Sequence, residues 1–151
     1  MRTSLLVVCI FTFLCTVALA DEPTQPPFAW QLIDTFPADG SADAPLNGVT
    51  AVRMQYGLSS QWPDQDTVLQ TVSLRLTRGE DEAVPGEVDV VPFIEEVRFA
   101  TEFPLDEGVE YTLRIDLLNS AIEPGSEDIS ETVRFTTGNR FDEAPPAFSG
   151  L

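Results

Sequence analysis

The sequence has 151 residues, of which 25 are acidic and 8 are basic, and its formal net charge is −17. All the basic residues are arginines, and the chain has no lysine and no histidine, so it lacks most general bases, Schiff-base formers and transition-metal ligands. The charge disfavours nucleic acid and anionic membranes as partners. We therefore expect a protein that is not an enzyme and that has a solvated, acidic surface.

Residues 1–20 have the pattern of a secretory signal peptide. An apolar run at 5–14 is followed by Ala-Leu-Ala at 18–20, which is a small-x-small cleavage site. An uncleaved anchor is the alternative, but the stretch is at the short end of the roughly 20 residues that a spanning helix needs, and no basic cluster follows it. Both cysteines, Cys9 and Cys15, leave with this segment. We predict a secreted, periplasmic or cell-surface protein without a disulfide and without a membrane span after cleavage.

The segment that follows the leader is polar and rich in proline. Residues 21–27 form this lead-in and are typical of a spacer. Residues 28–36 then alternate in polarity, which predicts a first strand at a sheet edge, ended by the Pro-Ala-Asp-Gly turn at 37–40. We expect a short extended link at 41–46, and the Asn-Gly pair at 47–48 is a strong turn signal.

Further strands are predicted between this turn and the middle of the chain. Residues 49–56 predict a core strand with one wet face, and 57–66 predict a polar loop. Residues 67–77 are the next alternating run, and 78–82 close a hairpin whose return strand runs over 84–91. The Pro-Gly pair near the start of that return strand marks an edge or a bulge.

The sandwich is organised around residues 97–117. Two alternating strands there flank a turn that contains Pro104, Asp106 and Gly108, which predicts a central hairpin. In its second strand one face is apolar throughout, which is typical of an antiparallel sheet that is buried on one side. The residues of that face are Tyr111, Leu113, Ile115 and Leu117.

The predicted elements together indicate the fold class. A loop at 118–130 leads to the last strand at 131–137, and residues 139–151 are expected to form a C-terminal tail. About seven to eight strands, with turn signals between them and no helical periodicity, predict an all-β antiparallel Greek-key β-sandwich over residues 28–138. The side chains expected to meet between its sheets are Leu32, Val52, Met54, Val72, Leu74, Leu76, Val88, Val90, Val97, Phe99, Leu113, Ile115, Val133 and Phe135.

Tyr111 stands at a position typical of a tyrosine corner. It follows Leu105 by six residues and Gly108 by three, at the start of a late strand. In Greek-key sandwiches such a tyrosine packs its ring inward, and its hydroxyl bonds to a backbone group a few residues upstream. The alternative is an ordinary core aromatic whose hydroxyl lies at the rim.

Several short motifs occur together in one order. They are Phe-Pro-Ala-Asp-Gly at 36–40, Ala-Pro-Leu-Asn at 44–47, Val-Arg-Met at 52–54, Phe-Pro-Leu-Asp-Glu-Gly-Val-Glu-Tyr-Thr-Leu-Arg-Ile at 103–115 and Val-Arg-Phe-Thr-Thr-Gly at 133–138. In this order and spacing they resemble the bacterial Ig-like domain of the S-layer SbsA type, over about residues 35–138. The resemblance implies an Ig-like β-sandwich on a secreted or cell-surface protein, with a scaffolding, adhesive or spacer role and no catalytic motif. The loop before the last strand departs from the Asp and Gly-Asn that the family usually has there.

Carboxylates are the only abundant reactive groups, so an enzyme would need a paired-acid hydrolase site. Glu95 and Glu96 would point to opposite faces of a strand, and the acids at 80–82 lie on a hairpin tip. Neither arrangement suits a paired site, and we predict no catalytic residue and no resident cofactor.

Calcium is the metal that the loops could bind, because it takes six to eight oxygen ligands from flexible acidic segments. The candidate ligands are Asp64, Asp66, Glu123, Glu127 and Asp128. Neither stretch matches the EF-hand pattern, and solvated loop acids are the alternative.

Trp62 is the candidate binding residue. It lies in a Gln-Trp-Pro-Asp loop, where an exposed indole presents a flat apolar face to a sugar or a protein. Covering the end of the sandwich is its alternative role, and Trp30 is expected in the core.

Two classes of function stay open. The favoured class is a secreted or cell-envelope module that acts as a structural spacer or protein-interaction domain, with an envelope or extracellular protein as its partner. The alternative is a carbohydrate- or calcium-binding module of the cell surface, with polysaccharide as its partner. The alternative requires a row of exposed aromatic side chains or converging loop carboxylates, whereas scattered acids and buried indoles favour the first class.

Overall fold

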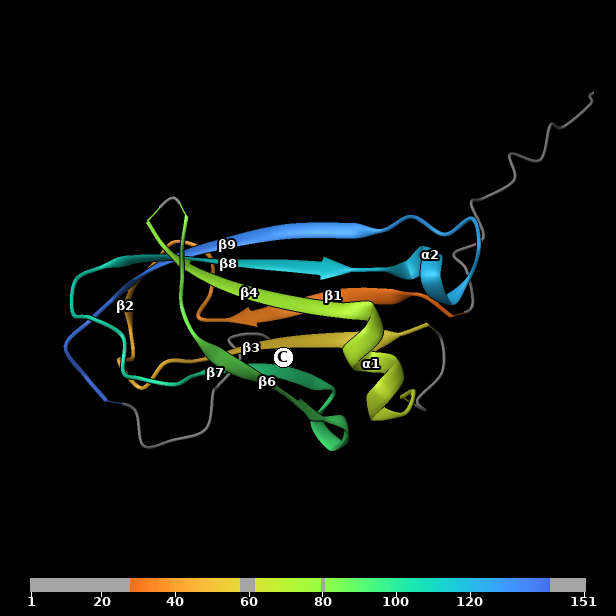
Figure 1. Ribbon diagram of the computed structural model, residues 1–151, viewed down its shortest axis with the longest axis horizontal. Coiled ribbons are helices and arrows are strands. Elements are labelled where there is room, and N and C mark those ends of the chain that lie inside the picture. The colour runs from red at the N-terminus through yellow and green to blue at the C-terminus, as the bar shows by residue number, and fades with distance from the viewer. Residues whose placement is uncertain (1–27, 58–61, 80, 142–151) are drawn as a thin grey trace, which may run out of the picture.

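The computed structural model describes residues 28–57, 62–79 and 81–141, which form two packed β-sheets (Figure 1). The predicted signal peptide, the lead-in and the tail from residue 142 onward lie outside these residues. One sheet has the order β1-β3-β7-β6, and its strands are β1 (Trp30–Phe36), β3 (Val49–Tyr56), β7 (Glu96–Thr101) and β6 (Gly86–Val91). The other has the order β2-β9-β8-β4-β5, and its strands are β2 (Ser41–Ala44), β9 (Ile129–Thr137), β8 (Glu110–Leu117), β4 (Val72–Arg78) and β5 (Glu82–Ala83).

This arrangement confirms the predicted all-β sandwich and its Ig-like class. The order β1-β3-β7-β6 corresponds to strands A, B, E and D of an immunoglobulin sandwich, and β9-β8-β4 corresponds to G, F and C. The described residues contain nine strands, slightly more than the seven to eight expected, because the short strands β2 and β5 lie in segments that the sequence pattern predicts as connections. One of these, β2, pairs in parallel with β9, while every other neighbouring pair is antiparallel.

The core lies between the sheets and contains the side chains predicted from alternation. Twelve of the fourteen are buried, while Leu32 and Val88 are partly buried and pack against the others. The core also includes Trp30, Val68, Leu105 and Leu117. The indole N–H of Trp30 donates to the hydroxyl of Thr71 at 2.9 Å, so this buried polar group has a partner.

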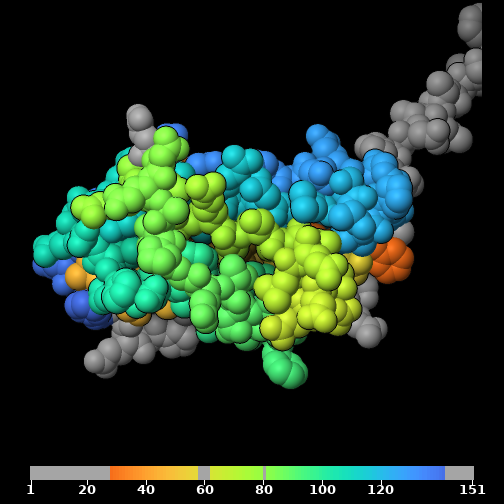
Figure 2. Space-filling model, viewed as in Figure 1, coloured from red at the N-terminus to blue at the C-terminus, as the bar shows by residue number. Residues whose placement is uncertain are grey.

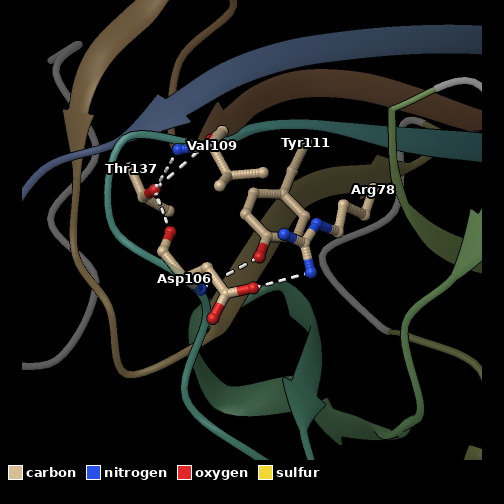
Figure 3. A network of polar contacts seen from close by, with 5 residues as sticks. All are labelled: Arg78, Asp106, Val109, Tyr111 and Thr137. Atoms are coloured by element: carbon tan, nitrogen blue, oxygen red, sulfur yellow. Dashed lines mark hydrogen bonds and ion pairs between the residues drawn. The ribbon is translucent and has the colours of Figure 1, made fainter.

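The tyrosine corner is confirmed (Figure 3). Tyr111 is buried, and its hydroxyl oxygen accepts the backbone N–H of Asp106 at 3.0 Å. The Asp106 carboxylate also pairs with Arg78 at 2.7 Å, and the hydroxyl of Thr137 accepts the N–H of Val109 at 3.1 Å. These contacts fix the turn before β8 to the strands on either side of it, β4 and β9.

The expectation of strand over 67–77 is wrong in its first part, because α1 (Gln65–Thr71) precedes β4. Asp64 is the N-cap of this helix, and its carboxylate accepts the backbone N–H of Thr67 at 3.0 Å. Val68 and Thr71, three residues apart on one helical face, are buried. A helix of two turns is too short for its period to be distinguished from alternation in the sequence.

The predicted central hairpin is also wrong, because β7 and β8 belong to different sheets. The connection over 102–109 crosses from one layer to the other, and Leu105 is buried in the core along it. Its N–H donates to the carbonyl of Leu46 at 2.8 Å. Alternation identified both strands and their inward faces, but it says nothing about the sheet to which a strand belongs.

The same correction applies to the return strand predicted at 84–91. The chain pairs with β4 only over β5, and β6 then pairs with β7 in the opposite sheet. Pro85 lies between the two pieces, where a residue without an N–H suits a change of sheet. In the loop expected at 118–130, α2 (Asn119–Ile122) forms, and β9 starts at Ile129 rather than at Glu131.

Candidate functional site

One lateral side of the sandwich is open, and it is bounded by β1 and β9. β1 is the outermost strand of its sheet. β2 pairs with β9 only at Phe135 and Thr137, so upstream of these residues no strand of the described chain covers that edge of β9. Figure 1 shows β9 as the uppermost strand of the view, with β2 near its left-hand end. The open edge therefore spans the first half of β9.

The backbone groups on this edge can be assigned from the contacts farther along β9. The N–H of Arg134 donates to the carboxylate of Asp39 at 2.8 Å, and the carbonyl of Arg134 accepts the N–H of Gly40 at 2.7 Å. The backbone groups of a strand point to its two edges alternately. Ser130 and Thr132, which have the parity of Arg134, therefore direct their N–H and C=O groups to the open edge.

A groove of about 720 Å³ lies between the two strands on this side. Leu32 and Ile129 supply apolar surface, and Glu127, Asp128 and Glu131 supply acidic side chains. The other lining residues are Ala29, Trp30, Gln31, Asn119, Ser126 and Ser130. The groove thus combines an apolar part, acidic side chains and a strand edge that no described strand pairs.

The side chain of Asn119 closes the edge of β1 at one end. Its amide oxygen accepts the N–H of Trp30 at 2.7 Å, and its amide nitrogen donates to the carbonyls of Trp30 at 3.2 Å and Glu127 at 3.1 Å. The two bonds to Trp30 take the place of those that a neighbouring strand would make. The register of β1 against β3 then shifts between Leu32 and Asp34, which is a bulge or irregularity. Such a feature makes a sheet edge a poorer template for pairing.

The acids predicted as calcium ligands lie at or beside the two short helices, α1 and α2. Asp64 caps α1, Asp66 is in the first turn of that helix, and Glu123 follows α2. Both carboxylate oxygens of Asp128 are bonded to Ser120, to its N–H at 2.8 Å and to its hydroxyl at 3.0 Å. Within the described part of the chain, no three acidic residues converge into a metal-binding group. Calcium binding stays a prediction, and these contacts of Asp64 and Asp128 give it no support.

Trp62 packs against the core rather than standing alone on the surface. Its ring makes an edge contact with the ring of Trp30 at 5.3 Å between centroids, and the side chain is partly buried. Its indole N–H is buried and has no hydrogen-bond partner among the described residues. Trp30 is almost fully buried, so the two indoles do not form an exposed row.

A second surface feature, which the sequence analysis did not identify, lies at the far edge of the β1 sheet. The 3₁₀ turn η1 (Pro92–Ile94) joins β6 to β7, and Phe93 on it is 99% exposed. Figure 2 shows this green segment protruding at the lower edge of the molecule. The η1 turn offers only an apolar tip. The groove on the opposite side offers apolar surface, acidic side chains and a strand edge that no described strand pairs, and it is therefore the better-defined candidate.

The groove could not be inferred from the sequence, because its walls come from residues about a hundred positions apart. The available signal was Glu131, a charged residue that has the inward parity of Val133 and Phe135 at the start of the last predicted strand. The order of the strands and the short length of β2 are needed to identify the edge as open.

Fold and site define an Ig-like two-sheet β-sandwich with one open lateral edge. The solved structures similar to it include PcoC, a methionine-rich copper resistance protein from Escherichia coli, at a TM-score of 0.53 and 14% identity over 72% of this chain and 98% of that chain. CopC from Methylosinus trichosporium OB3b is similar at a TM-score of 0.51 and 14% identity, over 72% of this chain and 93% of that chain. At this identity the likeness establishes the fold alone.

Comparison of the sequences adds no closer relative. No family model matches the chain, and no curated protein matches it. The Ig-like fold implied by the SbsA-type resemblance is confirmed, and membership of that family stays a prediction. In the part of the chain that the structure describes, no helix is long and apolar enough to cross a membrane.

Proposed function

We propose that this chain is a secreted or cell-envelope Ig-like module that is not an enzyme and that binds another protein at its open β9 edge. The observation that carries the proposal is the backbone of Ser130 and Thr132 beside the groove, which no strand of the described residues pairs. An extended segment of a partner can add to such an edge as a new strand, so that main-chain hydrogen bonds supply affinity and the adjoining pocket supplies specificity. The leader-like residues 1–20 support the proposed location.

Long unpaired edges are a risk for a secreted protein, because they promote aggregation. This chain protects the edge of β1 with the Asn119 amide and with the register shift near Leu32. On β9 it protects the second half with β2 and with Asp39 and Gly40. The short stretch that remains open beside the groove suits a binding site.

A copper-binding role of the kind named for PcoC is not proposed, because the residues present do not fit one. Copper sites in proteins use histidine, cysteine or methionine side chains. The 151 residues contain no histidine, and both cysteines lie in the first 15 positions. Apart from Met1 the only methionine is Met54, which is fully buried in the core. This chain therefore shares the fold of PcoC but lacks a set of the side chains that copper sites use.

The test is a single substitution that blocks hydrogen bonding at the open edge of β9 and leaves the other side chains of the groove unchanged. Thr132→Pro removes the outward N–H, and the β8–β9 ladder should survive because this N–H does not face β8. We expect capture of partner protein from the envelope fraction of the source to fall by about tenfold, which corresponds to one or two lost hydrogen bonds. The matched control, Thr132→Ala, keeps the N–H and should capture as the wild type does.

A cooperative urea transition checks that each variant is folded. If Thr132→Pro does not fold, the pair Ser130→Pro and Ser130→Ala makes the same comparison at the other outward position. Equal capture by a folded proline variant and its alanine control would overturn the proposal.

A further inference from the structure

Resting on the proposed function, we infer that the partner segment is an extended strand carrying a lysine or arginine, and that Glu131 selects it. The inference concerns the chemistry of the partner, whereas the proposed function concerns only the place and mode of binding. It rests on the position of Glu131, on the charge of the groove and on the length of the open edge.

Glu131 occupies a position in β9 whose side chain faces the core layer. It lies opposite Ile115 in the β8–β9 ladder, and residues directly opposite one another share a face of the sheet. Ile115 is completely buried, as is Phe135 on the same face of β9. Glu131 is instead exposed and lines the groove, because at this place the open edge replaces the opposite sheet.

An inward-pointing charge on an edge strand has two physical effects. It disfavours pairing with an apolar strand, because the carboxylate would lose water without gaining a partner. It favours a strand whose facing side chain is cationic, since a charge-assisted hydrogen bond then compensates for the lost hydration. Glu131 makes no ion pair with any described residue, so its carboxylate is available for such a contact.

The rest of the groove adds charge of the same sign. Glu127 and Asp128 line the same groove as Glu131, and none of the lining residues is basic. With a net charge of −17 on the whole chain, a cationic segment is attracted at long range and an acidic one is repelled.

The open stretch limits the length of the segment. It runs from Ile129 to Val133, after which Arg134 is already bonded to Asp39 and Gly40. Five residues of strand cover about 16 Å. The apolar residues at the groove, Leu32 and Ile129, would contact the side chains two positions away from the cation on the same face. The expected segment therefore has a cation between two apolar residues in an alternating pattern.

The inference can be tested with synthetic peptides that differ at one position. The first is Ser-Val-Thr-Arg-Thr-Val-Ser, in which the two valines and the arginine share one face, and two matched peptides carry Gln or Glu in place of Arg. Binding to the folded, secreted protein is measured by calorimetry at low salt. We expect the Arg peptide to bind about threefold to tenfold more tightly than the Gln peptide, and the Glu peptide to bind worst.

Four variants of the protein separate the inference from the proposed function. Glu131→Gln should abolish the preference for Arg over Gln, and Glu131→Lys should reverse it toward the Glu peptide. Glu107→Lys, which makes the same charge change at an exposed turn at the other end of β8, should leave the order of the three peptides unchanged. Thr132→Pro should weaken binding of every peptide.

The outcomes are distinct. A charge preference that follows residue 131 supports the inference. If Thr132→Pro weakens binding but substitutions of Glu131 do not change the order of the peptides, the inference is overturned and the proposed function stands. Binding of the peptides that Thr132→Pro does not affect overturns both, and failure of all three peptides to bind overturns the inference.

Discussion

At the scale of single residues, Tyr111 shows how one hydroxyl fixes a turn. Tyr111→Phe keeps the ring in the core but removes the acceptor of the Asp106 N–H. We expect the free energy of unfolding to fall by about 1 to 3 kcal/mol, because the Asp106 N–H would lose its partner at a partly buried bond. Urea unfolding measures the change.

Tyr56→Phe is the matched control for this substitution. Its hydroxyl makes no hydrogen bond with the described residues, and its ring packs on Trp30 at 4.8 Å between centroids. Its loss should therefore be small. Equal effects of the two substitutions would show that the Tyr111 hydroxyl contributes no more than an ordinary tyrosine at the rim.

At the scale of elements, the outer face of β8 and β9 holds a carboxylate with a shifted pKa. The guanidinium of Arg114 bonds to Asp116 at 3.0 Å and is the largest cause lowering the pKa of Asp116, and the hydroxyl of Ser130 donates to the same carboxylate at 2.6 Å. A carboxylate whose pKa is lower in the folded state stabilises the fold above its unfolded pKa, and this contribution is lost as the pH falls through the folded pKa.

The corresponding prediction uses Asp116→Asn. The difference in unfolding free energy between wild type and variant should be largest at neutral pH and should shrink as the pH falls below about 4. Urea unfolding at pH 7 and pH 3 measures it, with Asp81→Asn, an exposed turn residue, as the control. A difference that grows toward low pH would contradict the assignment of Arg114 and Ser130 as stabilising partners of Asp116.

The elements also show how far the sequence could predict the fold. Alternation in β4 and β8 depends only on which face is buried, so Leu74, Leu76 and Ile115 could be placed in the core before the structure was known. The sheet to which each strand belongs could not be predicted, because it depends on where the chain crosses from one layer to the other. Leu105 lies on such a crossing, but in the sequence it stands among turn residues, and only the structure shows that it is buried. The helix α1 was missed because it depends on the cap at Asp64 and on tertiary packing rather than on a long period.

The candidate site was beyond sequence analysis for the same reason. Its features arise from the end of pairing between β2 and β9 and from the proximity of β1 and β9, and both are long-range properties of the topology. By contrast, the acids and the indole that stood out in the sequence have local structural roles. Asp64 and Asp128 bond to helix N–H groups, and Trp62 packs on Trp30.

At the scale of the whole molecule, the net charge of −17 should set the response to salt. An excess of one charge destabilises the compact state by self-repulsion, and about 0.1 M salt shortens the range of that repulsion to about 10 Å. Salt also weakens ion pairs, but the pairs of Arg78, Arg114 and Arg140 are all substantially exposed, so little stability is lost by screening them. The relief of repulsion should therefore exceed the loss of attraction.

We expect the unfolding free energy to rise by about 1 kcal/mol between low salt and about 0.5 M sodium chloride. Urea is the suitable denaturant, because it is uncharged and leaves the ionic strength unchanged, and sodium chloride avoids the surface exclusion that sulfate adds. A variant that neutralises Asp81, Glu87 and Glu107, three exposed acids outside the groove, should be less sensitive to salt. If stability instead falls with salt in both proteins, the ion pairs of the arginines outweigh the repulsion, and the acidic surface stabilises the fold through them.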